Sequence, residues 1–196
     1  MNLIKHTDYI YEYQDFISSE TCDKIIDLIN FIPAKSLFHY DKNLIRYNIA
    51  VDLSSSRALH PNIKMVDDIS HDIFSKVHHQ YLQDCKLISF ILQRHHYFDM
   101  RSIYVYRQYS KNDFYDWHID DYKTRTNLIS YVVYLNDDFE GGKTLFLNDR
   151  LSVKPKKGTI LCFPCGLQWI HKSTKIKSGN KQILCTNFFA EEKGNV

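Results

Sequence analysis

The spacing of apolar and polar residues divides the chain into two halves with different expected secondary structure. All six glycines lie after position 140. Glycine marks tight turns and bulges between strands, so the second half of the chain predicts β structure. Residues 1–100, which lack glycine, are expected to be mainly helical.

Apolar residues recur at helical spacing in two stretches of the first half. A helix should begin at Ser18 or Ser19, either of which is a suitable N-cap, and it should end near Pro33. A second helix should begin at Pro61, because proline suits the first helical position. A third helix is expected over residues 87–97.

Alternating apolar residues predict strands elsewhere. Residues 45–53 alternate in this way and predict a half-buried strand in the first half. In the second half the strand-like segments are 101–109, 117–120, 127–136, 144–147, 151–154, 158–163, 169–175 and 181–189. Their number, length and turns are typical of a two-sheet jelly roll, or double-stranded β-helix, with four strands in each sheet. We therefore expect an α+β, β-dominated fold in which the N-terminal helices brace the outer face of one sheet.

Length and charge limit the class of protein. A chain of 196 residues fits a single domain over 1–196, with a helical part at 1–100 and a jelly-roll core at 101–190. The net charge of +2 does not indicate a nucleic-acid surface. Neither a signal-peptide pattern nor an apolar run of about 18 residues is present, which favours a cytoplasmic protein with no membrane partner. The helices carry no sustained heptad pattern, so the oligomeric state stays open.

Two groups of residues suggest additional metal sites but are better explained otherwise. Cys162-x-x-Cys165 is a single pair at the end of an apolar strand, whereas zinc ribbons need two pairs and redox pairs open a helix. The helical half also contains His78, His79, His95 and His96. These histidines fall on differing faces of the predicted helices, so we interpret them as solvated surface residues.

The spacing His-x-Asp places two metal-ligand types on one face of a strand. It occurs three times, as His6/Asp8, His39/Asp41 and His118/Asp120. Only the third pair leads into the run of strand-like segments, which also contains the isolated His171. Two imidazoles and one carboxylate with open positions opposite them are typical of non-haem Fe(II) oxygenases. We predict that His118, Asp120 and His171 bind a metal ion and that the other two pairs do not.

A buried cation is predicted ten residues after His171, at Lys181. In a strand, Lys181 shares one face with Ile183, Cys185 and Phe189. A lysine on an apolar face needs an anionic partner or water. The carboxylate of a cosubstrate is a suitable partner.

These residues together resemble the Fe(II)/2-oxoglutarate oxygenases, and the sequence segments around them resemble the prolyl 4-hydroxylase-like branch of that superfamily. The matching segments are Tyr109…Tyr115-Asp-Trp-His-Ile-Asp, Tyr134-Leu-Asn-Asp-Asp-Phe-Glu-Gly-Gly-Lys-Thr144, Val153-Lys-Pro-Lys-Lys-Gly158-Thr and Gly179-Asn-Lys181. The resemblance covers residues 100–190, and a weaker similarity is found at residues 16–24. It implies a catalytic Fe(II) centre, 2-oxoglutarate and O2 as cosubstrates, and ascorbate as a reductant. The cosubstrate would be converted to succinate and carbon dioxide.

The same resemblance implies roles for residues around the metal site. Tyr109 would contact the cosubstrate, and Thr144 would hydrogen-bond its distal carboxylate beside Lys181; an ordinary strand threonine is an equal alternative for Thr144. Tyr115 would lie near the substrate. Asn112 stands where the family usually has glycine, and asparagine tolerates the left-handed turn expected there.

The substrate-recognition positions depart from the family. Prolyl-peptide hydroxylases usually carry an arginine at the start of the strand that holds Tyr134 and a tryptophan six residues after the lysine. Asn127 and Asn187 stand at those positions here. Arg125 lies two residues before Asn127 and can reach the same face. Arg125, Asn127 and Asn187, with Tyr115, are therefore the candidate substrate contacts.

Several functions stay open at this point. The leading one is hydroxylation of an unactivated C–H bond in a prolyl or other residue of a protein or peptide. A free amino acid or other small molecule is the second candidate substrate. A nucleic-acid demethylase has a similar His-Ile-Asp-Asp motif, but that group usually has arginine where this chain has Lys181. A non-catalytic jelly-roll binding module does not need the complete ligand set that this chain retains.

Overall fold

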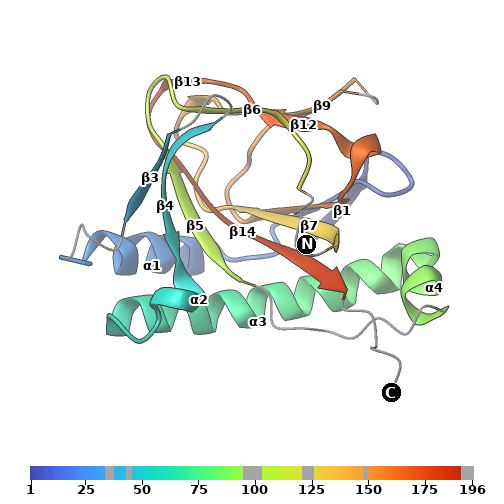
Figure 1. The fold of residues 1–196 in the computed structure, drawn as a ribbon, viewed down its shortest axis with the longest axis horizontal. Helices are drawn as coiled ribbons and strands as arrows, with labels where there is room; N and C mark the ends of the chain where they lie inside the picture. Colours follow the sequence, from blue (N-terminus) through green and yellow to red (C-terminus); the bar gives the residue numbers. More distant parts are fainter. Residues whose placement is uncertain (34–37, 43–45, 95–102, 121–125, 148–149, 191–196) are drawn as a thin grey trace.

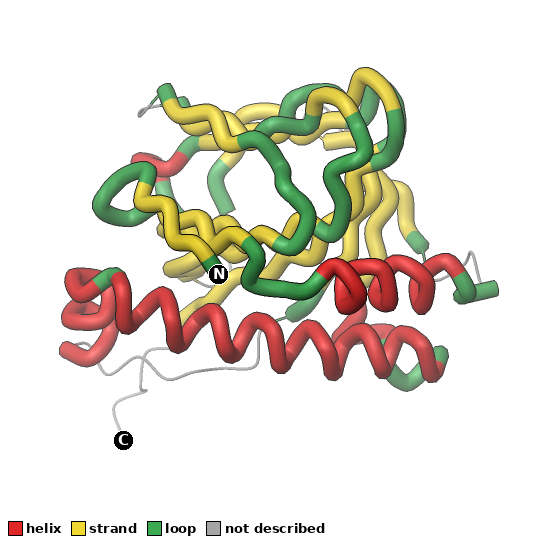
Figure 2. Tube along the Cα trace, turned by 180° about the vertical axis from the view of Figure 1, so that it is seen from behind, coloured by secondary structure: helices red, strands yellow, loops and turns green. Residues whose placement is uncertain are grey.

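Helices and strands occupy separate layers of the molecule (Figure 1). The computed structural model describes residues 1–33, 38–42, 46–94, 103–120, 126–147 and 150–190. Its helices are α1 (Ser19–Asn30), α2 (Leu53–Ser56), α3 (Pro61–Asp84) and α4 (Lys86–Arg94), with a 3-10 turn at Leu167–Trp169. Seen from behind, α1 and α3 lie side by side beneath the strands (Figure 2). Within the described residues, no helix combines the length and the apolar character that a membrane crossing requires.

The strands form one large antiparallel sheet and a small two-stranded one. Their bounds are β1 (Asn2–Lys5), β2 (Tyr11–Gln14), β3 (His39–Lys42), β4 (Arg46–Asp52), β5 (Val105–Tyr109), β6 (Phe114–His118), β7 (Thr126–Tyr134), β8 (Glu140–Gly141), β9 (Thr144–Phe146), β10 (Leu151–Val153), β11 (Thr159–Pro164), β12 (His171–Ser173), β13 (Ile176–Ser178) and β14 (Lys181–Ala190). In the large sheet the order is β1-β2-β11-β7-β14-β5-β4-β6-β12-β9-β10, with β3 on β4, while β8 pairs with β13. The sheet curls so that β6, β12 and β9 lie across from β7 and β14 (Figure 1). The predicted β-dominated jelly roll is confirmed.

Two apolar cores lie on opposite sides of the central strands. The larger one joins helices to sheet, for example through Ile25 of α1, Val66 of α3 and Val133 of β7. The smaller one lies inside the curled sheet and contains Tyr134 of β7 and Phe146 of β9. Successive side chains of a strand point to opposite faces, so β7 contributes to both cores. The helices therefore cover one face of the sheet, as the sequence predicted, and the other face is left for the site.

The helices predicted from the spacing of apolar residues are present in the structure. Ser18 caps α1 by accepting a hydrogen bond from the backbone N of Thr21, at 3.2 Å. Pro61 is the first residue of α3. The weaker third helix is also present as α4, although residues 95–97 lie outside the described part of the chain. Asn112 adopts the expected left-handed conformation, with φ of 72°.

The expectation that residues 1–100 are mainly helical is partly wrong. This half contains β1, β2 and β3 in addition to the predicted strand, which is β4. The four residues of β2 pair with β11, where Tyr13 lies opposite Ile160. A strand this short has no useful local periodicity, because distant pairing decides its conformation. The second-half strands were all predicted, apart from the short β8 and β13.

The interpretation of His78 as a solvated residue is wrong. Its Nδ1 is hydrogen-bonded to the hydroxyl of Tyr131 at 2.6 Å, and its ring stacks on Phe188 with centroids 4.4 Å apart. His79, the next residue of α3, is exposed, in agreement with the prediction. His95 and His96 lie outside the described residues. His78 thus connects α3 to the sheet.

We expect His78→Ala to lower the free energy of unfolding by about 1–3 kcal/mol, because it leaves the buried Tyr131 hydroxyl without this partner. The matched control is His79→Ala, which removes an exposed imidazole from the adjacent position. Chemical denaturation of both variants measures the difference. Equal stability of the two variants would show that the contact between His78 and Tyr131 contributes nothing.

Candidate active site

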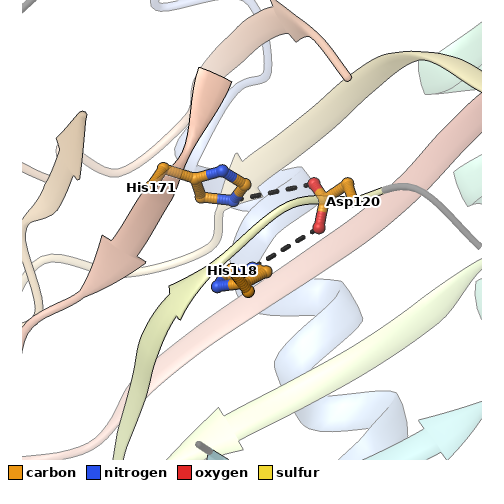
Figure 3. A group of neighbouring side chains, drawn as sticks. All are labelled: His118, Asp120 and His171. Carbon is orange, nitrogen blue, oxygen red and sulfur yellow. Dashed lines mark ion pairs between the residues drawn. The ribbon is translucent and has the colours of Figure 1, made fainter. Parts of the chain in front are cut away.

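The pairing of two strands brings His118 and His171 together. His118 is the last residue of β6, His171 is the first of β12, and the antiparallel register places them directly opposite each other. Asp120 follows β6 and turns its carboxylate toward both imidazoles (Figure 3). The three residues form a group whose ligand atoms all lie within 4.8 Å of one another.

The distances in this group suit one metal ion. Nε2 of His118 lies 3.4 Å from Oδ1 of Asp120, and Nε2 of His171 lies 3.7 Å from Oδ2 (Figure 3). Two atoms bound at right angles to one ion, each at about 2.1 Å, are about 3 Å apart. For these two pairs, side-chain adjustments of less than an ångström would reach that spacing.

Backbone carbonyls fix which nitrogen of each imidazole faces the centre. Nδ1 of His118 lies 2.7 Å from the carbonyl oxygen of Asp116, and Nδ1 of His171 lies 2.9 Å from that of Trp169. A carbonyl oxygen only accepts hydrogen bonds, so each Nδ1 carries the proton and donates it. The lone pairs of both Nε2 atoms are then directed into the site, as metal ligation requires.

The protonation states that a metal needs are favoured at two of the three residues. Burial lowers the pKa of His171, and the nearby His118 adds to this effect while Asp120 opposes it. Burial alone would raise the pKa of Asp120, but electrostatic interaction with the imidazoles of His171 and His118 and the hydrogen bond from Ser130 hold that pKa well below its usual range. A neutral imidazole and an ionised carboxylate are the ligating forms.

Aromatic rings hold the two imidazoles in place. The ring of Tyr115 stacks on His118 with an interplanar angle of 8°. On the other side, Phe163 and Phe146 of the smaller core contact the ring of His171, with centroids 4.7 Å and 5.6 Å away. The two imidazoles can therefore turn little before a metal binds.

Lys181 is buried beside this centre. It pairs with Tyr109 across β14 and β5 and is 2% exposed. Its Nζ donates to the carbonyl oxygen of Gly142 at 2.8 Å and to Oγ of Ser173 at 3.0 Å. Both acceptors are uncharged, and burial lowers the pKa of Lys181 to about 7. These two contacts bring no negative charge to the ammonium group. A carboxylate that entered the pocket could therefore pair with it.

Gly142 fits closely under the lysine. It has φ of 62°, and a Cβ added there would lie 3.0 Å from Cδ of Lys181 and 2.8 Å from Cδ1 of Ile176. A side chain at this position would thus be strained and crowded. The glycine allows its carbonyl to approach the ammonium group.

One pocket contains both the metal-ligand group and the lysine. It has a volume of about 760 Å³, open to solvent, and the predicted residues that line it are Tyr109, Tyr115, His118, Asp120, Thr144, His171, Lys181 and Asn187. Thr144 lies opposite Ser173 across β9 and β12, and its hydroxyl is hydrogen-bonded to that of Tyr134 at 2.8 Å. Ile183 and Cys185 share the pocket face with Lys181, as expected. The site predicted from four separate segments of sequence is spatially continuous.

The remaining predicted residues lie elsewhere. Asn127 is not part of the pocket lining, and its Nδ2 donates to the backbone oxygen of Asp120 at 2.6 Å. Arg125 lies outside the described residues. His6 pairs with Glu12 at 2.8 Å, outside the metal-ligand group. The side chains of His39 and Asp41 are not among those described.

The cysteine pair lies on β11 and just beyond it. Cys162 is fully buried in the larger core, and burial raises the pKa of its thiol well above the usual value, which makes it unreactive. Cys165 instead places its Sγ 3.0 Å from Oγ of Ser130. The two thiols have different surroundings.

Sequence reasoning missed four residues of the site. Arg46 and Arg107 line the pocket, Ser173 contacts Lys181, and Ser130 donates to Asp120. Ser173 was accessible to prediction, because it lies two residues after His171 and so shares its face. Ser130 also left a signal, as the one small polar residue between Leu128 and Tyr134 of β7. The arginines gave none, since the place of Arg107 depends on the pairing of β4 with β5 and that of Arg46 on the pairing of β4 with β6.

Fold and site together combine a jelly roll with a 2-His-1-carboxylate group, an arrangement that is typical of non-haem Fe(II) oxygenases. The family model described as the 2OG-Fe(II) oxygenase superfamily matches residues 104–190. Over these residues the chain is similar to a superfamily that is named for Fe(II) and 2-oxoglutarate. The matched stretch begins just before β5 and ends with β14, so it includes the candidate site residues of the jelly roll.

Solved structures of prolyl hydroxylases share the fold over nearly the whole chain. The viral collagen prolyl hydroxylase of Paramecium bursaria Chlorella virus-1, in complex with 2-oxoglutarate, is 22% identical with a TM-score of 0.66, covering 93% of this chain and 97% of that one. A Pseudomonas putida prolyl-4-hydroxylase is 16% identical with a TM-score of 0.65, covering 93% of each. A Trichoplax adhaerens prolyl hydroxylase, in complex with a hypoxia-inducible-factor peptide fragment, is 14% identical with a TM-score of 0.68, covering 93% and 84%. No curated protein sequence matches the chain.

Proposed function

We propose that this protein hydroxylates an unactivated C–H bond in a prolyl residue of a protein or peptide. The observation that carries the proposal is the single pocket that joins the His118–Asp120–His171 group to the buried Lys181. The fold shared with prolyl hydroxylases supports the choice of substrate.

In this proposal, each residue has a separate task. His118, Asp120 and His171 hold Fe(II), which together with 2-oxoglutarate and O2 supplies the oxidising power for C–H hydroxylation. Lys181 binds the distal carboxylate of 2-oxoglutarate, and Thr144 and Tyr109 complete its pocket. Tyr115, stacked on His118, forms a wall on the substrate side. The buried lysine thereby sets the direction in which the cosubstrate lies.

A free amino acid is a second candidate substrate, favoured by charge. Arg46, Arg107 and Lys172 line the same pocket as Lys181, whereas Asp120 is the only acidic residue in its described lining. A guanidinium group binds a carboxylate well, and a free amino acid offers one next to the carbon to be hydroxylated. A peptide would need an acidic side chain to make the same contact.

The proposal is tested by 2-oxoglutarate turnover with Fe(II), ascorbate and O2. We expect succinate formation to rise when a proline-containing peptide is added, and the peptide to gain one oxygen atom by mass spectrometry. The same peptide with hydroxyproline in place of proline is the matched control and should not stimulate turnover. Stimulation by free amino acids alone would favour the second candidate, and no stimulation by either class would reject both.

A further inference from the structure

Two side chains with no task in the proposed reaction, the buried Ser130 and the half-buried Asn187, lead from Asp120 into the sheet. Ser130 lies on β7 and Asn187 on β14, and the register pairs them directly opposite each other. Residues paired in this way project to the same face of a sheet. Ser130 is 1% exposed, so its hydroxyl must be satisfied by protein groups.

The hydrogen bonds of Ser130 have a defined direction. Its Oγ lies 2.6 Å from Oδ2 of Asp120, 2.8 Å from Nδ2 of Asn187 and 3.0 Å from Sγ of Cys165. A carboxylate only accepts and an amide nitrogen only donates, so the single hydroxyl proton goes to Asp120. Ser130 then accepts from Asn187, and from the thiol of Cys165. One donor and two acceptor positions are all used.

The backbone of Asp120 is held as well. Nδ2 of Asn127, from the first turn of β7, donates to the carbonyl oxygen of Asp120 at 2.6 Å. Both asparagines that replace the family's arginine and tryptophan are therefore directed at this carboxylate residue or at its partner.

We propose that Ser130 and Asn187 are positioning residues that orient the carboxylate of Asp120 for metal binding. Ser130 anchors Oδ2, and this leaves Oδ1, 3.4 Å from Nε2 of His118, as the oxygen presented to the ion. Asn187 acts through Ser130, because its amide keeps the hydroxyl turned toward Asp120. The inference rests on the proposed metal-binding role of Asp120.

Binding of Co(II) to the purified protein, followed by calorimetry and by visible absorption without 2-oxoglutarate, tests this network. We expect Ser130→Ala to weaken Co(II) binding about 10–100-fold, the range found when partners of metal ligands are removed. Ser130→Thr, which keeps the hydroxyl, should retain most of the affinity. Asn187→Leu should weaken binding less, and the double variant should bind no more weakly than Ser130→Ala alone.

The matched control is Thr159→Val, which removes a buried hydroxyl that has no hydrogen-bond partner from the adjacent strand β11. It should leave Co(II) affinity unchanged. If Ser130→Ala does not fold, Asn187→Leu against Thr159→Val decides the question. Wild-type affinity in a folded Ser130→Ala or, in that case, in Asn187→Leu overturns the network, whereas failure of the wild-type protein to bind Co(II) overturns the metal site itself.

Discussion

His171→Ala is expected to abolish the Fe(II)-dependent conversion of 2-oxoglutarate to succinate. The change removes one of the three residues whose ligand atoms converge, and the remaining pair, His118 and Asp120, cannot hold the ion from both strands. Even the loss of an outer partner costs about 10–100-fold in metal affinity, so the loss of a ligand should exceed about 100-fold. Succinate release and metal content of the purified protein measure the effect.

The control for this prediction is His79→Ala, which removes an exposed histidine from α3. It should keep wild-type turnover. Because His171 is 6% exposed and packs against Phe163, circular dichroism must show that the His171→Ala protein is folded. A folded variant with undiminished turnover would exclude the 2-His-1-carboxylate site.

Most of the candidate site was predictable because its signals in the sequence are local. His118 and Asp120 are two residues apart, which predicted one shared face, although β6 ends at His118 and Asp120 reaches the site from just beyond the strand. Lys181 stands out as a cation in an apolar alternating segment. His171 required more, since its place opposite His118 depends on the register of β6 and β12. Here the resemblance to a family supplied what periodicity lacked.

Contacts between distant segments were not predictable in the same way. The hydrogen bond of His78 to Tyr131 joins residues of α3 and β7, so a helical pattern read alone assigned this histidine to the surface. The short β2 exists because β11 offers it hydrogen bonds. Asn127 and Asn187 were singled out as departures from the family, but the sequence did not indicate that their amides contact Asp120 and Ser130. These are properties of packing.

The affinity for 2-oxoglutarate is expected to fall as the pH rises above about 7. Burial lowers the pKa of Lys181 to about 7 in the absence of a carboxylate partner. A carboxylate beside the ammonium group favours its charged form and raises this pKa, so binding takes up a proton above pH 7. The Kd should therefore be constant from just below pH 7 downward, as long as the metal stays bound, and should increase about tenfold for each pH unit above 7. Calorimetry of the Co(II)-loaded protein in buffers of different ionisation enthalpy measures both the affinity and the proton uptake.

The variant Lys181→Arg distinguishes the contribution of Lys181 to the pH dependence of Kd from that of other titrating groups. Arginine keeps its proton over this pH range, so the variant should bind 2-oxoglutarate with a Kd that no longer rises tenfold per unit, even if the larger side chain weakens binding at every pH. A rise that persists in Lys181→Arg would assign the titration to another group, such as a metal-bound water. A wild-type Kd that stays constant to pH 9 would mean that Lys181 is already protonated before the cosubstrate arrives. In that case the contacts with Gly142 and Ser173 stabilise the charged form more than burial opposes it.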